Sequence, residues 1–255
     1  MTNKTHASLV TDQFGPQAAA YVTSAVHAEG EDLEALTKVV AGQRGAQVLD
    51  LGCGGGHVSF RVAPHVSQVT AYDLSEGMLA AVAKAAAERG LKNVATRQGA
   101  AERLPFANES FDFVVSRYSA HHWHDFQAAL REARRVLKPD GRAVFMDAIS
   151  PGPALLDTYL QAVELLRDPS HLRDYSLAEW VQAVTGAGFA PGTIVQRRVR
   201  LDFASWIARM RTPEIRAQAI RSLQAEMSSD VVTHFAIEAD GSFMLDIMSL
   251  EATPI

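Results

Sequence analysis

From about residue 46 to residue 150, short apolar runs rich in β-branched residues alternate with longer segments of helical periodicity. The short runs predict strands and the longer segments predict helices, with Ser75 and Asp125 as amino-terminal caps. Strands that alternate with helices pair in parallel, with helices on both faces of the sheet. The predicted strands are 46–51, 68–72, 93–98, 111–116 and 142–149, the predicted helices are 57–63, 75–89 and 125–137, and a turn is predicted at 138–141.

The chain after residue 150 is less regular. It predicts helices at 155–166, 177–187 and 205–227 and two further strands at 193–203 and 242–252. Two late strands separated by a helical insert indicate a small cap that grows from a sheet edge. The prediction is therefore an α/β fold of the Rossmann-like, doubly wound type, with a mostly parallel seven-stranded sheet and a small helical cap. Its core is 46–150, and 151–255 completes the sheet around a cap insert at about 204–238.

Composition excludes several classes of protein. The chain has 255 residues, 47% of them hydrophobic, which suits one domain with an ordinary core. Its formal net charge of −5 argues against a nucleic acid as the main partner, since such proteins carry a basic face. Cys53 is the one cysteine, so no disulfide can form within the chain. The polar start and the lack of a long apolar run predict no signal peptide and no membrane span, and hence a cytoplasmic protein.

A glycine-rich loop between the first strand and the first helix is the strongest local signal. Residues 48–57 read VLDLGCGGGH, with four glycines within five positions. Such a loop lets the backbone approach a ligand closely, because no Cβ obstructs it. The dinucleotide pattern G-x-G-x-x-G would need glycine or alanine where His57 or Ser59 stands, so it fails in both registers. The pattern present is an acid followed by alternating glycines, D-x-G-x-G-x-G from Asp50.

This first motif resembles that of the class I methyltransferases that use S-adenosylmethionine (SAM). Further segments extend the resemblance: AYDLS at the end of the second strand, SEGML after it, GAAERLPF after the third strand, SRYSAHHW after the fourth and RVLKPDG before the fifth. Together they resemble the methyltransferases of ubiquinone and menaquinone biosynthesis. The segments RDPSH and SW…RTP in the carboxyl-terminal half are similar to bacterial members of the YafE/YcgJ kind. The resemblance implies SAM as cofactor, S-adenosylhomocysteine (SAH) as product and a small-molecule methyl acceptor.

The resemblance also implies which residues contact the cofactor. Asp73 stands where the family places the acid that binds both ribose hydroxyls, and a carboxylate suits a diol because it accepts from two donors. Met78 stands where an apolar side chain covers the adenine. The family commonly has an acid at position 100, so with Ala100 adenine recognition would rest on the backbone near Ala101 or on Glu102. The expected cofactor contacts are Tyr21, Asp50, Gly52, Cys53, Gly54, Asp73, Leu74, Met78, Ala100, Ala101, Ser116 and Arg117.

An amino-terminal segment is expected to cover the cofactor. In related enzymes a segment like 14–21 forms a helix over it, so residues 1–45 are expected to form a helical lid. Aromatic faces favour a sulfonium cation by roughly 0.5–2 kcal/mol, and the candidates for such a face are Tyr21 and Tyr118. An ordinary amphipathic helix is an equally supported alternative for 14–21.

Candidate catalytic residues lie in the segment HHWH after the fourth strand. Methyl transfer is an in-line displacement, so positioning dominates, and a general base is needed only if the acceptor must first lose a proton. His121 and His122 are the candidates for that base or for a substrate contact, because histidine exchanges a proton near neutral pH. Loop capping or packing is the alternative for both. No metal site is expected, since adjacent histidines point in different directions.

Arginines crowd the late part of the chain, where lysine is absent after Lys138. Guanidinium groups suit a carboxylate or phosphate on a substrate, and Arg209 and Arg211 are the candidates for such a contact. A solvated surface of the cap is the simpler alternative for both.

Two other functions stay open from the sequence. An NAD-type Rossmann oxidoreductase is disfavoured by His57 and Ser59. A SAM-binding protein without catalysis is compatible with Ala100 and with the lack of an unmistakable base. The chain has no Asn-Pro-Pro-Tyr-like segment after the fourth strand, where methyltransferases of bases and of glutamine amides hold the nitrogen, so a small-molecule acceptor is favoured.

Overall fold

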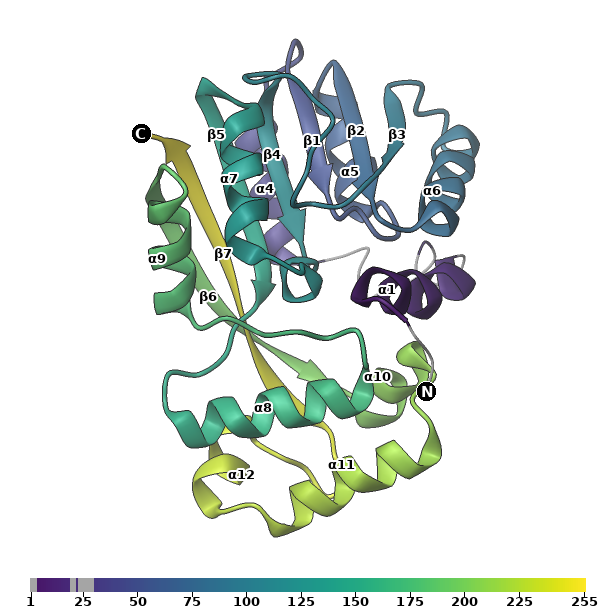
Figure 1. Ribbon diagram of the computed structural model, residues 1–255, viewed down its shortest axis with the longest axis vertical. Coiled ribbons are helices and arrows are strands. Elements are labelled where there is room, and N and C mark those ends of the chain that lie inside the picture. Colours follow the sequence, from purple (N-terminus) through teal and green to yellow (C-terminus); the bar gives the residue numbers. More distant parts are fainter. Residues whose placement is uncertain (1–3, 19–21, 23–29) are drawn as a thin grey trace.

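A seven-stranded sheet forms the centre of the computed structural model, which describes residues 4–18, 22 and 30–255 (Figure 1). The strands are β1 (Gln47–Leu51), β2 (Gln68–Asp73), β3 (Val94–Gln98), β4 (Phe111–Arg117), β5 (Leu137–Ala148), β6 (Phe189–Leu201) and β7 (Phe243–Pro254). Their order across the sheet is β3-β2-β1-β4-β5-β7-β6. β1 to β5 pair in parallel, whereas β7 pairs antiparallel with both β5 and β6. The predicted mostly parallel seven-stranded sheet is confirmed.

Helices cover both faces of this sheet (Figure 1). The helices of the described residues, including those away from the sheet, are α1 (His6–Phe14), α4 (Glu31–Val40), α5 (His57–Val62), α6 (Glu76–Glu88), α7 (Phe126–Val136), α8 (Ala154–Arg167), α9 (Leu177–Gly186), α10 (Phe203–Met210), α11 (Glu214–Glu226) and α12 (Ser229–Phe235), with 3-10 turns at Gly15–Gln17, Ala63–His65 and Ala120–His122. Successive residues of β1 point to opposite faces. Val48 joins a buried cluster with Leu36 of α4, and Leu49 joins another with Leu130 of α7 and Trp180 of α9.

The chain order reverses at the centre of the sheet. β2 and β3 lie on one side of β1, whereas β4 and β5 lie on the other. At such a point the connections leave in opposite directions, and a crevice opens at the carboxyl ends of the strands. The glycine loop after β1 and the loop after β4 therefore begin beside each other.

Local signals in the sequence place most element boundaries correctly. Ser75 caps α6 and Asp125 caps α7, because each side chain accepts a hydrogen bond from a backbone N–H of the first turn. The predicted turn 138–141 is wrong, because these residues lie inside β5. The irregularity there is a shift in the register with β4, between Phe111 and Phe113.

Helices α8, α10, α11 and α12 form a small layer beyond the sheet, at the lower end of Figure 1. One apolar cluster joins Leu160 of α8, Trp206 of α10 and Ile220 of α11 to Leu245 of β7. Because α8 precedes the expected insert 204–238, this layer draws on a wider part of the chain than that insert.

The predicted single helix 205–227 is wrong, because the structure has two helices there. α10 ends at Met210, and Arg211 follows in the left-handed conformation with φ of 50°. α11 begins at Glu214, directly after Pro213. Proline has no N–H, and its ring clashes with the preceding helical turn, so one helix cannot run through Pro213.

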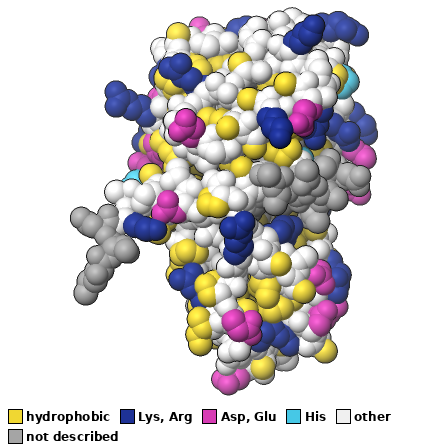
Figure 2. All heavy atoms as spheres, turned by 90° about the vertical axis from the view of Figure 1, so that its right-hand side faces the viewer, with side chains coloured by type: hydrophobic (Ala, Val, Ile, Leu, Met, Phe, Trp, Pro, Cys, Tyr) yellow, Lys and Arg dark blue, Asp and Glu magenta, His cyan; other side chains and the backbone are white. Residues whose placement is uncertain are grey.

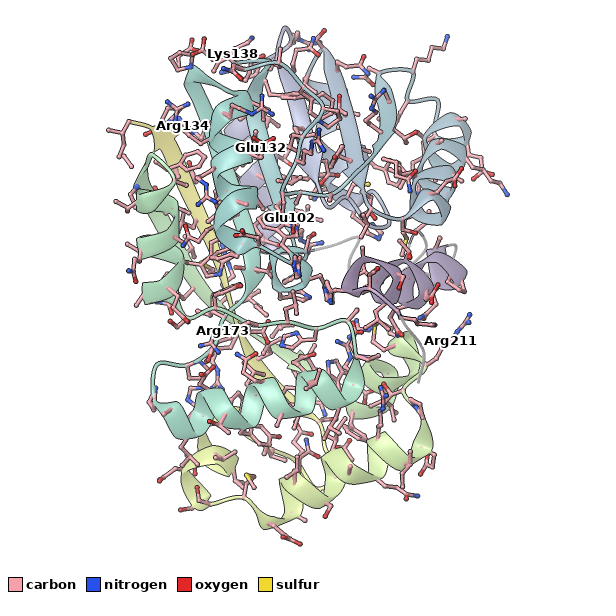
Figure 3. The ribbon with its side chains drawn as sticks, viewed as in Figure 1. Glu102, Glu132, Arg134, Lys138, Arg173 and Arg211 are labelled. Carbon is pink, nitrogen blue, oxygen red and sulfur yellow. The ribbon has the colours of Figure 1, made fainter. Side chains whose placement is uncertain are left out.

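Arg173 connects the small layer to the main sheet (Figure 3). Its guanidinium group contacts Asp157 of α8 at 3.2 Å and Glu179 of α9 at 3.1 Å. α9 packs on the sheet, so this pair of contacts ties α8 to the sheet layer.

The described surface is mixed in charge. On the face shown in Figure 2, acidic and basic side chains are interspersed with apolar ones. None of the helices within the described residues combines the length and the apolar character needed to cross a membrane.

Candidate active site

The glycine loop after β1 has a backbone that other residues adopt only with strain. Gly52 and Gly54 have φ angles of 74° and 48°. A Cβ on Gly52 would lie 1.8 Å from the hydroxyl oxygen of Ser119, in the loop after β4. A Cβ on Gly54 would meet no atom within 4 Å, and Gly54 lines a cavity. Gly52 therefore lets the two loops approach each other, whereas Gly54 leaves space for a ligand.

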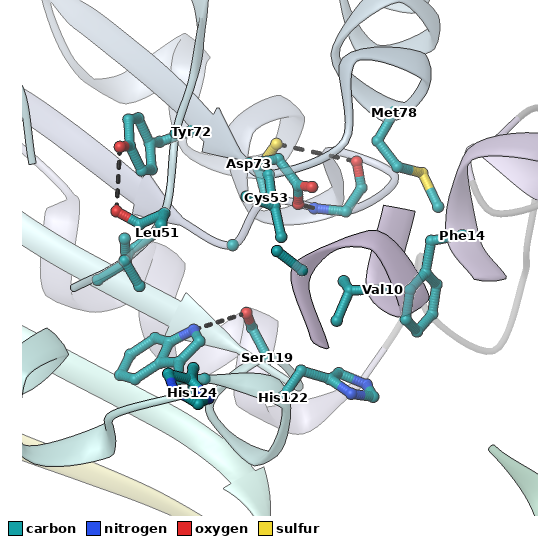
Figure 4. A pocket seen from close by; sticks show the side chains of 18 of the residues that line it. Val10, Phe14, Leu51, Cys53, Tyr72, Asp73, Met78, Ser119, His122 and His124 are labelled. Carbon is teal, nitrogen blue, oxygen red and sulfur yellow. Dashed lines mark hydrogen bonds between the residues drawn. The ribbon is translucent and has the colours of Figure 1, made fainter. Parts of the chain in front are cut away.

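The carboxylate of Asp73 joins the loops after β1 and β2 (Figure 4). Its Oδ2 accepts a hydrogen bond from the N–H of Gly54 at 2.9 Å, and its Oδ1 accepts one from the N–H of Ser75 at 2.8 Å. Burial raises the pKa of Asp73, and these hydrogen bonds oppose that rise. Each carboxylate oxygen keeps a further lone pair, so the group can still accept from a ligand with two hydroxyls.

Asp50 holds the start of α5. Its Oδ2 accepts hydrogen bonds from the N–H of Ser59 at 3.0 Å and from the Ser59 hydroxyl at 2.6 Å. Burial raises the pKa of Asp50 to about 7, although the bonds from Ser59 favour the ionised form. Asp50 lines the cavity, yet one of its oxygens is committed to the helix.

A cavity of about 540 Å³ lies at the carboxyl ends of the central strands. Helix α1 closes its other side with His6, Val10 and Phe14 (Figure 4). Of the expected cofactor contacts, the lining includes Asp50, Gly52, Cys53, Gly54, Asp73, Leu74, Met78, Ala100, Ala101 and Arg117. Ser116 does not line it, because its side chain is buried within β4. Tyr21 lies outside the described residues.

A second cavity of about 540 Å³ lies between the sheet and the small helical layer. Its walls come from α8, α10 and the ends of β6 and β7, with residues such as Glu164, Trp206, Leu201 and Ile247. The residues that line both cavities are Phe14, Arg117, Tyr118 and His122. These four side chains mark where a ligand in one cavity would meet a ligand in the other.

Two of the shared residues are held tightly. Arg117 pairs with Asp32 at 2.5 Å, and both side chains are only 6% exposed. Tyr118 has φ of 51°, a left-handed conformation that costs a non-glycine residue about 1–3 kcal/mol. Burial raises the pKa of Tyr118 to about 12, so its hydroxyl stays protonated. Strain of this kind persists where the surroundings fix the residue, as they do here between the two cavities.

The two adjacent histidines differ in charge at neutral pH. Burial disfavours the charge on His121, but the contact of its Nδ1 with Asp147 at 2.6 Å outweighs this and raises the pKa of His121 to about 9. Burial and the neighbouring charge of His121 lower the pKa of His122 to about 4. At neutral pH, position 121 therefore carries an imidazolium and position 122 a neutral imidazole.

Hydrogen bonding fixes the tautomer of His122. Its Nδ1 lies 3.0 Å from the backbone oxygen of Ser170, which can only accept, so Nδ1 carries the proton. Its Nε2 is left with a lone pair and lies 3.8 Å from Oδ2 of Asp168. Asp168 is fixed in turn by the N–H and the hydroxyl of Ser170, at 2.8 and 2.6 Å.

Two of the acids near these histidines carry no motif in the sequence that marks them as site residues. Asp168 and Asp174 lie between α8 and α9, in and after the RDPSH segment. A polar segment between two helices was the only indication of these residues in the sequence. Whether Asp168 or Asp174 comes near His122 depends on how distant parts of the chain pack. Of the two arginine candidates, Arg209 lines the second cavity, whereas Arg211 donates to the backbone of Pro16 at 3.5 Å (Figure 3) and lines neither cavity.

Comparison with known proteins identifies the family. A family model described as a methyltransferase domain matches residues 49–145. YafE of Escherichia coli is 51% identical over 77% of this chain and 95% of its own length. The methyltransferase YcgJ of Bacillus subtilis is 37% identical over 86% of this chain and 84% of its own length. The chain belongs to the methyltransferase family.

The methyltransferase shares its fold with a solved relative. The crystal structure of YcgJ matches 87% of this chain and 97% of its own with a TM-score of 0.84 at 33% identity. A demethylmenaquinone methyltransferase of Listeria monocytogenes is 31% identical over 58% of this chain and 65% of its own length. The methyltransferase is therefore a SAM-dependent enzyme with a Rossmann-like fold, as the resemblance implied, and the NAD-type alternative is set aside.

Replacing Asp73 with alanine is expected to weaken SAH binding by about one to two decades. Charge-assisted hydrogen bonds contribute about 1.5–3 kcal/mol, and each decade of affinity corresponds to about 1.4 kcal/mol. Isothermal titration calorimetry measures the dissociation constant. Asp112→Ala is the matched control, because Asp112 also accepts from a backbone N–H, that of Gln47 at 2.8 Å, but lines neither cavity. Equal SAH affinities of the two variants would remove Asp73 from the binding site.

Proposed function

We propose that the methyltransferase binds SAM in the cavity at the glycine loop and transfers its methyl group to a small molecule held in the second cavity. The observation that carries this proposal is the meeting of the two cavities at Phe14, Arg117, Tyr118 and His122. A methyl donor and its acceptor must approach in line, and two separate but connected cavities provide for that.

The residues of the first cavity suit SAM. Gly54 leaves space that any larger side chain would fill, and Asp73 offers acceptors for a ribose diol. Met78 and Leu74 supply apolar surface for the adenine. Glu102 also lines the cavity, where its Oε1 accepts from the N–H of Asp125 at 3.2 Å, so adenine recognition without an acid at position 100 has a nearby carboxylate. When bound, SAM supplies an electrophilic methyl group on a positively charged sulfur.

Side chains at the junction divide the remaining tasks. The guanidinium carbon of Arg117 already lies 4.8 Å from the ring centroid of Tyr118, so a sulfonium near this ring would share its cation–π attraction with Arg117. His122, neutral and with a lone pair on Nε2, is the group that can accept a proton from the acceptor at neutral pH. His121, held as an imidazolium by Asp147, suits binding better than proton removal.

The second cavity favours a small acceptor over a macromolecule. About 540 Å³ is within the usual range of small-molecule sites. The small helical layer and α1 border it, with Trp206, Met210 and Phe14 in its walls. A polypeptide or a nucleic acid would need an open groove.

Filling the second cavity tests this assignment. Ile247→Trp adds a large ring to a residue that lines the second cavity and not the first. With the natural chain, tritium from methyl-labelled SAM is expected to appear in the small molecules of a bacterial extract, in the fraction below about 1 kDa. In Ile247→Trp this transfer should fall at least about tenfold, while the SAH dissociation constant stays within about twofold. Label that enters protein or nucleic acid instead, or equal transfer by both chains, would contradict the proposal.

A further inference from the structure

Asp174 is a buried acid whose Oδ2 has no hydrogen-bond partner among the described residues. It lies in the wall of the second cavity and is 1% exposed. Its backbone is fixed, because its N–H and C=O bond to the side chain of Gln161 at 3.1 and 2.8 Å. Oδ2 is fully buried, and no donor among the described residues reaches it. A buried carboxyl group in this state is unfavourable unless a proton or a ligand completes it.

The other acids of this cavity already have partners. Glu164 pairs with Arg167 at 3.2 Å, and Asp168 accepts two bonds from Ser170. Asp32, which also lines this cavity, pairs with Arg117, and Glu31 pairs with Arg197. Among the acids that the structure places in this wall, Asp174 is thus the one that an occupant of the cavity would complete.

His121 lies next to Asp174, and a contact with Asp147 fixes the orientation of its imidazole ring. Nδ1 of His121 contacts Oδ1 of Asp147 at 2.6 Å, and Asp147 is fixed by the N–H groups of Ala120 and Ala148, both at 2.9 Å. Potential ligand atoms of His121, Asp147 and Asp174 all lie within 4.8 Å of one another. Only His121 and Asp174 of these three line the cavity, and Nε2 of His121 has no hydrogen bond within the described residues.

The chemistry of this pair selects one kind of ligand group. Burial, with the nearby charge of Glu164, raises the pKa of Asp174 to about 8, and that of His121 is about 9. Below about pH 9, each populated protonation state therefore offers at least one donor and at least one acceptor. A hydroxyl both donates and accepts, whereas an ether or a carboxylate only accepts and an ammonium only donates. Of these groups, only a hydroxyl satisfies both partners whether Asp174 is protonated or ionised, because a carboxylate or an ether has nothing to donate to the ionised carboxylate.

We propose that the methyl acceptor carries a hydroxyl group, and that this group binds between Nε2 of His121 and the carboxyl of Asp174. This inference rests on the proposed function, because it takes the second cavity as the acceptor site. The rest of the acceptor is apolar where it meets the apolar part of the lining, which includes Leu201, Trp206 and Leu245. Asp147 acts through His121 as a positioning residue.

Three matched probes test the proposal with the full chain saturated with SAH. They are p-cresol, which has a hydroxyl, 4-methylanisole, which replaces it with an ether, and p-toluate, which replaces it with a carboxylate. At about pH 8.5, where Asp174 is mostly ionised and His121 is still charged, calorimetry or ligand-observed NMR is expected to give p-cresol at least a fivefold lower dissociation constant than either of the others. That factor is the low end for leaving one buried polar group unpaired. Equal affinities, tighter binding of p-toluate or no measurable binding of p-cresol would overturn the proposal.

Variants assign the preference to Asp174. Asp174→Leu should abolish the preference for p-cresol, whereas Asp174→Asn, which keeps one donor and one acceptor, should retain it. Glu31→Leu is the control, since Glu31 lines the same cavity but already pairs with Arg197 at 3.0 Å. A preference that persists in Asp174→Leu, or that is lost in Glu31→Leu, would contradict the assignment.

Stability separates a binding role from a structural one. Because no donor in the described chain reaches Oδ2 of Asp174, Asp174→Leu should melt at or above the temperature of the natural chain. A lower melting temperature would mean that the carboxyl is structural. The two proposals also fail separately. If the natural chain does not bind SAH, the proposed cofactor site is refuted. If it binds SAH but binds the three probes with equal affinity, only the proposed hydroxyl site is refuted.

Discussion

Replacing Gly54 with valine is expected to reduce SAH affinity by more than about a hundredfold while leaving a folded protein. A Cβ at this position meets no protein atom within 4 Å, so the added side chain projects into the first cavity. The left-handed backbone, with φ of 48°, adds a cost of about 1–2 kcal/mol for a residue other than glycine. The stability loss should therefore be small and the binding loss large. Calorimetry with SAH and a thermal melt measure the two separately.

Gly90→Val provides a matched control for that variant. Gly90 follows α6 with φ of 70°, and a Cβ there would also meet no atom within 4 Å, but Gly90 lines neither cavity. Both variants should lose similar stability, and only Gly54→Val should lose SAH. If Gly54→Val is simply unfolded, the glycine is structural and the loss of binding says nothing about the cavity. If it binds SAH normally, the cofactor does not lie against this loop.

Replacing His122 with alanine is expected to lower turnover by about 10²–10⁴-fold with little change in SAH affinity. This is the usual contribution of a general base, and His122 lines both cavities as a neutral imidazole. Its low pKa of about 4 also gives the direction of the pH profile. The base is active when unprotonated, so its contribution is present above about pH 5 and is lost as the pH falls through 4. Transfer of tritium to the acceptor fraction measures both effects.

Asparagine at position 122 distinguishes catalysis from placement. The amide of asparagine can replace Nδ1 and donate to the backbone oxygen of Ser170, but it has no counterpart of Nε2. A base role predicts that His122→Asn is as slow as His122→Ala. Recovery of turnover in His122→Asn would show that the ring only packs and holds Ser170. A raised Michaelis constant at constant turnover would make His122 a substrate contact.

The parts of the fold that follow from neighbouring residues could be predicted from the sequence. The glycine loop, Asp73 after β2 and the caps Ser75 and Asp125 depend on spacing within one or two elements, and the structure has them in the expected places. The break in the predicted helix 205–227 was also visible in the sequence, because Pro213 stands near its middle. Helical periodicity on both sides of Pro213 outweighed that local signal in the prediction.

The second cavity could not be predicted in this way. Asp147 comes from the end of β5, whereas Asp168 and Asp174 come from the segment after α8. They meet around His121 and His122 only because α8 and its following loop fold back over the end of β5. Their spacing in the sequence carries no pattern. Ser116 is an error of the other kind, because its position in the motif predicted a cofactor contact. Side chains alternate between the two faces along β4, and that of Ser116 points to a buried face.

Strands β6 and β7 belong to two hydrophobic cores at once. Phe189 and Leu250 lie in the core of the main sheet, whereas Leu201, Phe243 and Leu245 lie in the core of the small helical layer. Each strand runs continuously from one core into the other, and the two pair over this length with one register shift between Pro191 and Ile194, so neither core can form completely without the other. The part that we propose to bind the acceptor therefore cannot be exchanged as an independent unit. Relatives that change acceptor must do so by substitutions along shared strands, each constrained by the stability of the whole enzyme.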